Sequence, residues 1–299
     1  MSVEFCGLEL AHPVLNGSGT FDLIAAARVF GEEVREYFPF SAYVSKTITL
    51  QPRTGNPPPR LWEAPAGLVN SIGLPNKGLD GYMAEDLPLL SGLRTTASDG
   101  APAAVPVITN VMGASAEELT HLVQACDARP EIAAIELNVS CPNVRTGLDI
   151  GSDPAQLEAV VRAVRPATRK PLIVKLTPNT ADVALCAQGA ERGGADAVSL
   201  INTLRAMALS PGRPGEHWLG GGTGGLSGPA IRAIALAQVA AVAARVTIPV
   251  IGMGGVQTAA HARELLDVGA TLIAVGTESF RDPAAGTRIA SGLQALSAA

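Results

Sequence analysis

Short apolar runs alternate along the chain with longer segments of helical periodicity. The runs predict strands at 41–46, 105–111, 132–138, 171–176, 195–201, 248–252 and 271–276, with a short eighth strand near 67–69. Helices are predicted at 22–37, 78–91, 115–128, 154–167, 180–192, 229–244 and 258–267, and after 276. Strands that are apolar throughout are typical of a parallel sheet buried on both faces. The pattern therefore predicts an α/β fold, a (β/α)8 barrel of one domain spanning 1–299, with an N-terminal hairpin at 3–10.

Two long loops interrupt the alternation. Residues 49–76 are rich in proline and glycine, and residues 202–228 are rich in glycine. A loop this long inside a compact domain is usually either functional or disordered. The apolar side chains of Leu68, Val69, Ile72 and Leu74 favour an ordered loop in the first case.

Composition narrows the class of protein. A hydrophobic share of 47% with 16% charged residues indicates a large core, and the net charge of −5 gives no basic surface for nucleic acid. The four cysteines form no CxxC pair, so no metal site, iron–sulfur cluster or disulfide framework is expected. The N-terminus lacks the pattern of a signal peptide, and Arg232 and Arg245 interrupt the Ala-rich stretch 230–251. A cytoplasmic protein without a membrane anchor is expected.

Polar and glycine residues gather where the predicted strands end. Active sites of (β/α)8 barrels lie at the carboxyl ends of the strands. The residues there are Lys46, Asn110, Asn138 with Cys141, Lys175, Asn202 with Thr203, Gly254 with Gly255, and Gly276 with Thr277. Lysine is rarely buried without a partner, because removing its ammonium from water is costly. Lysines so close to apolar strands therefore suggest a site, although Lys175 could instead be salt-bridged across the barrel.

The glycine clusters predict an anion site. Gly252-Met-Gly-Gly255 follows the seventh strand, Gly276-Thr277 follows the eighth, and Gly224–Gly228 could join them. Loops after these two strands frequently bind phosphate in barrel enzymes, through backbone N–H groups and a helix N-terminus. A phosphorylated cofactor with a substrate above it is the interpretation that we adopt.

The segment Asn138-Val-Ser-Cys-Pro-Asn143 places two carboxamides and a thiol at the end of a strand. Alone, it could be an ordinary turn. A nucleophilic Cys141 would need a nearby histidine, and none of the four histidines falls at a strand end. Cys141 acting as a base is the better interpretation. Because a thiol has an unperturbed pKa of ~8.5, such an enzyme is expected to work better at alkaline pH.

Motifs along nearly the whole chain resemble those of the dihydroorotate dehydrogenase family. They are Asn16-Gly-Ser-Gly-Thr, Lys46-Thr, Pro52-Arg-Thr-Gly-Asn-Pro, Asn70-Ser-Ile-Gly-Leu-Pro-Asn, Asn138-Val-Ser-Cys-Pro-Asn, Val174-Lys-Leu-Thr-Pro, Ile201-Asn-Thr, Gly225-Leu-Ser-Gly, Gly252-Met-Gly-Gly and Gly276-Thr. The resemblance implies oxidation of dihydroorotate to orotate in pyrimidine biosynthesis with FMN as cofactor. Cys141 would take the C5 proton while the C6 hydride passes to flavin N5.

The resemblance also assigns binding residues. FMN would be held by Ser18, Lys46, Thr47, Asn110, Asn138, Lys175, Ile201, Gly228, Gly254, Gly255, Gly276 and Thr277. Dihydroorotate would be held by Lys46, Asn70, Ser71, Ile72, Gly73, Leu74, Asn138, Asn143, Asn202 and Thr203. Carboxamides suit a ring that presents alternating C=O and N–H groups.

The cysteine at the base position and the motifs Pro52–Pro57 and Gly252–Gly255 are most like those of class 1B enzymes. That class implies a partner subunit carrying FAD and a [2Fe-2S] cluster, in a homodimer or heterotetramer. Departures from the family pattern lie at Arg145–Gly151, at Ala206 and at Gly220–Gly225. The alternatives are a related flavin oxidoreductase acting on another dihydropyrimidine, and a flavin-free barrel that serves as a binding or scaffold subunit.

Overall fold

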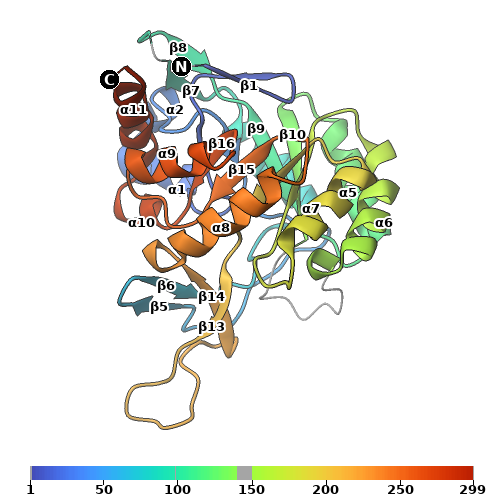
Figure 1. The fold of residues 1–299 in the computed structure, drawn as a ribbon, viewed down its shortest axis with the longest axis vertical. Coiled ribbons are helices and arrows are strands. Elements are labelled where there is room, and N and C mark those ends of the chain that lie inside the picture. Colours follow the sequence, from blue (N-terminus) through green and yellow to red (C-terminus); the bar gives the residue numbers. More distant parts are fainter. Residues whose placement is uncertain (1, 98, 140–149, 299) are drawn as a thin grey trace.

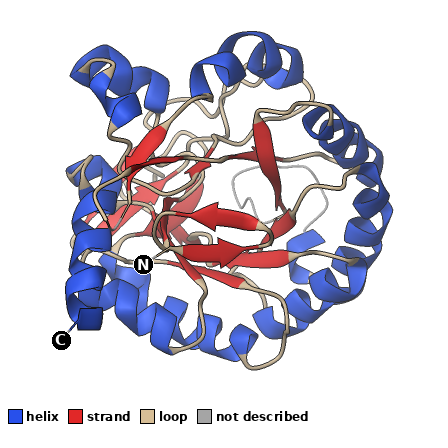
Figure 2. Ribbon diagram, turned by 90° about the horizontal axis from the view of Figure 1, so that it is seen from above, coloured by secondary structure: helices blue, strands red, loops and turns tan. Residues whose placement is uncertain are grey.

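Eight parallel strands form a barrel surrounded by helices. The computed structural model describes residues 2–97, 99–139 and 150–298. The strands are β3 (Val14–Asn16), β4 (Tyr43–Val44), β9 (Val107–Val111), β10 (Ile132–Asn138), β11 (Leu172–Lys175), β12 (Ala197–Leu200), β15 (Val250–Met253) and β16 (Leu272–Val275). They are hydrogen-bonded in the order β3-β16-β15-β12-β11-β10-β9-β4. Seen from above in Figure 2, helices surround the strands, which confirms the predicted (β/α)8 barrel.

One strand assignment was wrong. The segment near 67–69 is β6 (Gly67–Asn70), which lies outside the barrel in an antiparallel sheet with the order β13-β14-β6-β5. The missing barrel strand is Val14–Asn16, which pairs with β16 in parallel. It has only three residues between Pro13 and Gly17, so its apolar run is too short to be recognised from periodicity.

The other three strands of this small sheet come from the predicted long loops. They are β5 (Leu61–Ala64), β13 (Leu204–Met207) and β14 (Thr223–Ser227). In Figure 1 the sheet lies below the barrel, and the loop between β13 and β14 projects from it. A further antiparallel pair is formed by β7 (Arg94–Thr96) and β8 (Pro102–Ala104).

The predicted helices are present with shifted ends. They are α1 (Leu23–Phe30), α2 (Glu33–Glu36), α3 (Gly78–Gly81), a π-helical turn (Tyr82–Asp86), α4 (Leu87–Leu90), α5 (Ala116–Asp127), α6 (Pro154–Val164), α7 (Val183–Gly193), α8 (Arg232–Ala243), α9 (Ala259–Asp267), α10 (Glu278–Arg281) and α11 (Ala285–Ala298). The helix expected at 22–37 is divided, because α1 ends at Gly31 with φ +83°. Short 3-10 turns at 150–152, 165–167 and 229–231 flank α6 and precede α8. Asp153 caps α6, where Pro154 occupies the first turn as expected.

A side chain closes the barrel between its first two strands. β3 and β4 lie at the two ends of the hydrogen-bonded order. The Val44 backbone N–H donates to Asn16 Oδ1 at 2.9 Å, and Asn16 Nδ2 donates to the Val44 carbonyl at 2.8 Å. The Asn16 carboxamide therefore takes the place of a strand residue. It is fully buried, so water does not compete for these bonds.

We expect Asn16→Ala to destabilise the barrel by about 2–5 kcal/mol, because two buried backbone groups of Val44 lose their partners. Urea unfolding of the variant and the parent measures the difference. Ser41→Ala is the matched control at the same seam. Its hydroxyl donates to the Val14 carbonyl, which also accepts from the Ser41 N–H, so its loss should cost less than about 1 kcal/mol. Equal stability losses in the two variants would contradict this role for Asn16.

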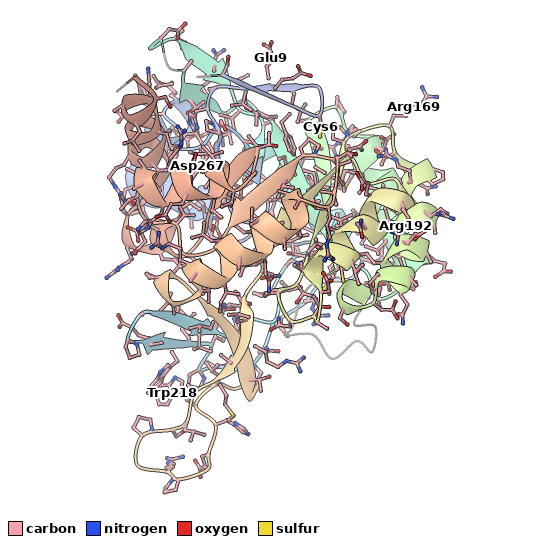
Figure 3. The ribbon with its side chains drawn as sticks, viewed as in Figure 1. Cys6, Glu9, Arg169, Arg192, Trp218 and Asp267 are labelled. Atoms are coloured by element: carbon pink, nitrogen blue, oxygen red, sulfur yellow. The ribbon has the colours of Figure 1, made fainter. Side chains whose placement is uncertain are left out.

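The two ends of the barrel differ. The predicted N-terminal hairpin, β1 (Val3–Phe5) and β2 (Leu8–Leu10), fills the amino end, where Phe5 and Leu10 are buried in the apolar interior cluster. In Figure 3 Cys6 and Glu9 mark this end, and Trp218, beside the small sheet, lies at the opposite end. The interior is therefore closed with apolar side chains at one end and meets polar loops at the other.

Candidate active site

A polar layer lies on top of the apolar barrel interior. Side chains two residues apart in a strand point to the same face. Ile108, Ala134, Ile173 and Ala197 belong to the interior cluster, and two positions further along the same strands stand Asn110, Glu136, Lys175 and Ser199. All four polar side chains are buried. Each of these strands therefore changes from apolar to polar near its carboxyl end.

Glu136 links three strands within this layer. Asn110 Nδ2 donates to Glu136 Oε2 at 2.5 Å, and Ser199 Oγ donates to Glu136 Oε1 at 2.6 Å. The Asn110 backbone N–H donates to Ser45 Oγ at 3.0 Å. Asn110 Oδ1 is buried without a hydrogen-bond partner in the part of the chain that the structure describes. The sequence assignments missed Glu136 and Ser199. A charged residue inside the apolar run 132–137 was the available signal.

Asn138, two residues beyond Glu136 on β10, links the ends of other strands. Asn138 Nδ2 donates to Thr47 Oγ1 at 3.1 Å, and Thr47 Oγ1 lies 3.5 Å from Ser18 Oγ. The Ser18 hydroxyl donates to the Ser45 carbonyl at 2.8 Å. Asn138 is also in register with Lys175 on β11. The structure thus brings Ser18, Thr47, Asn138 and Lys175 together at the carboxyl ends of four strands.

The two lysines differ in burial. Lys175 is 6% exposed and forms no ion pair among the described residues, so a salt bridge across the barrel is not found there. Lys46 is exposed, so the expectation that both lysines are buried was wrong. It lies two residues after the buried strand β4, beyond the residues that pair with β9. The burial of Lys175 without an ion pair among the described residues favours an anionic or polar ligand beside it, because removing an ammonium from water is costly.

The glycine loop after β15 meets the start of α8. Gly254 and Gly255 have φ +131° and +71°. A Cβ on Gly255 would lie 2.7 Å from Arg232 Cβ and 3.0 Å from Arg232 Cα, at the first residue of α8. A Cβ on Gly254 would lie 3.3 Å from Ile201 Cγ1. Backbone amides next to a helix N-terminus are suited to bind an anion.

Gly228 and Thr277, which follow β14 and β16, lie side by side at the same end of the barrel. Thr277 Oγ1 donates to Ser227 Oγ at 2.8 Å. Gly228 has φ +89°, and a Cβ there would lie 2.9 Å from Gly67 Cα and 3.5 Å from Thr277 Cγ2. Gly276 precedes Thr277 and directly follows β16. The loops after β14, β15 and β16 therefore converge, as the glycine pattern suggested.

Strand β14 brings together the two loops that carry the remaining sequence-predicted residues. Asn70 Nδ2 donates to the Gly225 carbonyl at 3.2 Å. A Cβ on Gly225 would lie 1.9 Å from Thr203 Oγ1, so Thr203 packs directly on the glycine. The Thr203 N–H donates to Asn202 Oδ1 at 2.8 Å. Segments 70–74 and 202–203 therefore lie on either side of β14.

The segment 70–74 is held by a neighbouring loop. Asn56 Nδ2 donates to Ser71 Oγ at 3.0 Å, and the Asn56 N–H donates to the Ile72 carbonyl at 3.0 Å. Gly73 packs so closely on Asn56 that a Cβ would lie 2.5 Å from its backbone nitrogen. Leu74 has φ +56°, which is unusual for leucine. The first long loop is ordered, as its apolar residues suggested.

Cys141 and Asn143 lie outside the described residues. The described residues on either side are in contact, since a Cβ on Gly151 would lie 2.4 Å from the Val139 carbonyl oxygen. Val139 directly follows β10, at the level of Asn138 and Lys175.

The three cysteines that the structure describes are unsuited to act as a base. Burial raises the pKa of Cys6 to about 11 and that of Cys126 to about 12, and burial also raises the pKa of Cys186. All three remain thiols at neutral pH. The described ranges 2–97, 99–139 and 150–298 contain no group of three or more His, Cys, Asp or Glu side chains able to hold a metal ion.

A cavity of about 460 Å³ lies away from these strand ends. Its lining includes His12, Phe38, Thr95, Leu266 and Leu293, which precede barrel strands or belong to β7, α9 and α11. Burial lowers the pKa of His12 to about 4, so this histidine is neutral at pH 7. This cavity is at the amino end of the barrel and contributes nothing to the polar layer.

The fold and the polar carboxyl end define a (β/α)8-barrel protein whose chemistry is expected at the strand ends. The family model for dihydroorotate dehydrogenase matches residues 1–296. The chain belongs to the dihydroorotate dehydrogenase family.

Curated relatives carry a more specific name, "Dihydroorotate dehydrogenase B (NAD(+)), catalytic subunit". The protein of that name from Trichlorobacter lovleyi is 44% identical over 298 residues, covering 98% of this chain and 92% of the relative. The Pelobacter propionicus protein is 43% identical over 298 residues, and the Geobacter sulfurreducens protein is 44% identical over 300 residues, with the same two shares. Among the described helices, none has the length and apolar composition that crossing a bilayer requires.

Proposed function

We propose that this chain is the catalytic subunit of a class 1B dihydroorotate dehydrogenase, which oxidises dihydroorotate to orotate in pyrimidine biosynthesis. The observation that carries the proposal is the position of Lys175. It is a buried lysine without an ion pair among the described residues, in register with Asn138, at the strand ends of a family member. The whole chain, residues 1–299, acts as a single FMN-binding domain.

The residues present fit FMN. Asn110 Oδ1 is a buried acceptor that needs a donor, and the oxidised isoalloxazine ring offers an N–H. Gly228, Gly254, Gly255, Gly276 and Thr277 hold the phosphate, next to the start of α8. Ser18, Lys46, Thr47, Asn138 and Ile201 surround the ring and the ribityl chain. Lys175 places a positive charge beside the ring, which is a general means of tuning a flavin.

Dihydroorotate binds above this layer. The exposed ammonium of Lys46 is available for the substrate carboxylate. Asn70 to Leu74 contact the ring from one side of β14, and Asn202 and Thr203 from the other. Asn138 and Asn143 supply carboxamides that match the C=O and N–H groups of the ring.

Cys141 removes the C5 proton of the substrate. When bound, FMN supplies the acceptor for the hydride that leaves C6. Cys141 reaches the substrate from the segment that follows β10, so the base and Asn138 approach the same ring. Because the thiolate is the active form, the rate of substrate oxidation should rise with pH toward the thiol pKa of about 8.5.

Electrons then leave through a second subunit. The relatives are named as the catalytic subunits of an NAD(+)-linked enzyme, which supports a partner. We infer that the partner carries FAD and a [2Fe-2S] cluster, and that the assembly is a cytoplasmic heterotetramer built on a homodimer of this chain. An acceptor screen tests this inference: NAD with and without co-purified partner, fumarate and quinone, each with dihydroorotate as donor. NAD reduction without a partner would contradict it.

Two measurements test the activity itself. Visible flavin absorption after reconstitution with FMN separates the proposal from a flavin-free scaffold subunit. Anaerobic mixing with dihydroorotate, and separately with dihydrouracil, then separates it from a flavin enzyme for another dihydropyrimidine. We expect dihydroorotate to bleach the flavin and dihydrouracil to leave it oxidised. Bleaching by dihydrouracil alone would overturn the substrate assignment.

We expect Gly255→Ala to weaken FMN binding at least about tenfold, because the new methyl group would collide with Arg232 at the helix start and displace the glycine loop. Fluorescence titration of FMN measures the effect. Gly212→Ala is the matched control. Gly212 has φ +75°, close to that of Gly255, but a Cβ there meets no atom within 4 Å. Unchanged FMN affinity in the Gly255 variant would remove this loop from the phosphate site.

A further inference from the structure

Glu136 is the acidic member of the buried polar layer that it forms with Asn110, Lys175 and Ser199. It is 3% exposed and forms no ion pair with any described residue. Burying a carboxyl group is unfavourable unless it is paired or hydrogen-bonded. Each of its oxygens accepts one short hydrogen bond, from Asn110 and from Ser199. Neither Glu136 nor Ser199 is among the residues assigned to the cofactor or the substrate.

The hydrogen bond from Asn110 fixes the orientation of its amide. The carboxyl oxygen Oε2 accepts, so the amide must turn its Nδ2 toward Glu136. The amide oxygen then necessarily faces the other way. That oxygen, Oδ1, is the buried acceptor without a partner among the described residues. Without an acceptor at position 136, the amide could present either its oxygen or its NH2 group in that direction.

We propose that Glu136 is a positioning residue that orients the Asn110 carboxamide so that its Oδ1 accepts a hydrogen bond from the ring N–H of FMN. The inference rests on the proposed function, because it takes FMN as the ligand. The oxidised isoalloxazine ring carries a single N–H group, at N3. A fixed acceptor favours this protonated form and gives affinity for the neutral ring.

Ser199 holds Glu136 in place and determines which side chain could replace it at position 136. Its hydroxyl donates to Glu136 Oε1, but a hydroxyl can also accept. A glutamine at position 136 can therefore accept from Asn110 with its oxygen and donate to Ser199 with its NH2 group. Methionine has a similar volume and offers no acceptor of comparable strength. The two substitutions separate the acceptor function from the negative charge.

The test is a double-mutant cycle on FMN affinity. Glu136→Met should raise the FMN dissociation constant about tenfold or more, because the Asn110 amide loses the bond that orients it. Glu136→Gln should restore most of the affinity. Asn110→Ala should weaken FMN binding at least as much as Glu136→Met does. In the Asn110→Ala background, Glu136→Met should then have no further effect, because its only route to the flavin is gone.

A spectroscopic measurement checks the same point at the ring. The visible absorption of bound FMN during an alkaline titration reports ionisation at N3. In Glu136→Met the amide is free to turn its NH2 group to the N3 anion, so the pKa of bound N3–H should fall by about one unit. Glu131→Met is the matched control, because Glu131 precedes the same strand and pairs with Arg129 on the surface. It should change neither the affinity nor the titration.

The outcomes are distinguishable. If the parent protein does not bind FMN, the proposed function fails. If the parent binds FMN but Glu136→Met leaves both affinity and N3 ionisation unchanged, the positioning role fails while the proposed function stands. A Glu136→Gln variant as weak as Glu136→Met would show that the charge matters and overturn the proposal. Additive effects of Glu136→Met and Asn110→Ala would overturn it as well.

Discussion

Cys141→Ala should leave FMN bound and slow its reduction by dihydroorotate about 10²–10⁴-fold, the usual contribution of a positioned acid–base group. The affinity should persist because Cys141 is not among the residues proposed to hold FMN. Stopped-flow measurement of flavin bleaching under anaerobic conditions gives the rate. The dependence of the parent rate on the thiolate form should disappear in the variant, which leaves a flat pH profile.

The control for this experiment is a cysteine at the opposite end of the barrel. Cys6 lies in the N-terminal hairpin, where its Sγ donates to the Asp196 carbonyl. Cys6→Ala removes a thiol of the same kind and should not alter the rate of flavin reduction. If Cys141→Ala reduces its flavin as fast as the parent protein, Cys141 is not the base.

Lys175→Met should slow flavin reduction about a hundredfold, since removing one group that stabilises developing charge typically costs 10²–10³ in rate. The side chain is buried and lies in register with Asn138 and Ser199, so water does not replace its charge easily. The reduction potential of the bound FMN should fall in the variant, because the anionic reduced ring loses a cation. Spectroelectrochemical titration measures that shift.

Lys170→Met provides the matched comparison, at the other end of the same strand. Lys170 precedes β11 at the amino end of the barrel and donates to the Cys126 carbonyl at 3.0 Å. Its loss should affect stability and leave the flavin potential unchanged. A normal potential and a normal reduction rate in Lys175→Met would show that this lysine serves only the structure.

The barrel could be predicted from sequence because strands buried on both faces leave continuous apolar runs. That signal failed for β3, which has only three residues. On one side β3 is linked to β4 by the Asn16 side chain and not by a backbone ladder. The signal also failed for β13, which has only four residues, and for β14, where two glycines remove the pattern of side chains that a strand would show. Their pairing is decided by contacts between residues far apart in the chain, such as Asn70 with Gly225.

The candidate site was predictable to the extent that unusual residues stood at strand ends. Lys175 was recognisable because a lysine interrupts an apolar strand. Glu136 carries the same signal, but its partners Asn110 and Ser199 come from strands on either side, and only the barrel brings them together. The exposure of Lys46 could not be foreseen either, because position relative to a short strand does not determine burial.

The most direct test of the central claim is anaerobic mixing of the FMN-loaded chain with dihydroorotate, following flavin absorbance and orotate formation together. The proposal predicts that the flavin bands bleach and that orotate appears in a one-to-one ratio with reduced FMN. Bound flavin that stays oxidised in the presence of excess dihydroorotate would contradict it.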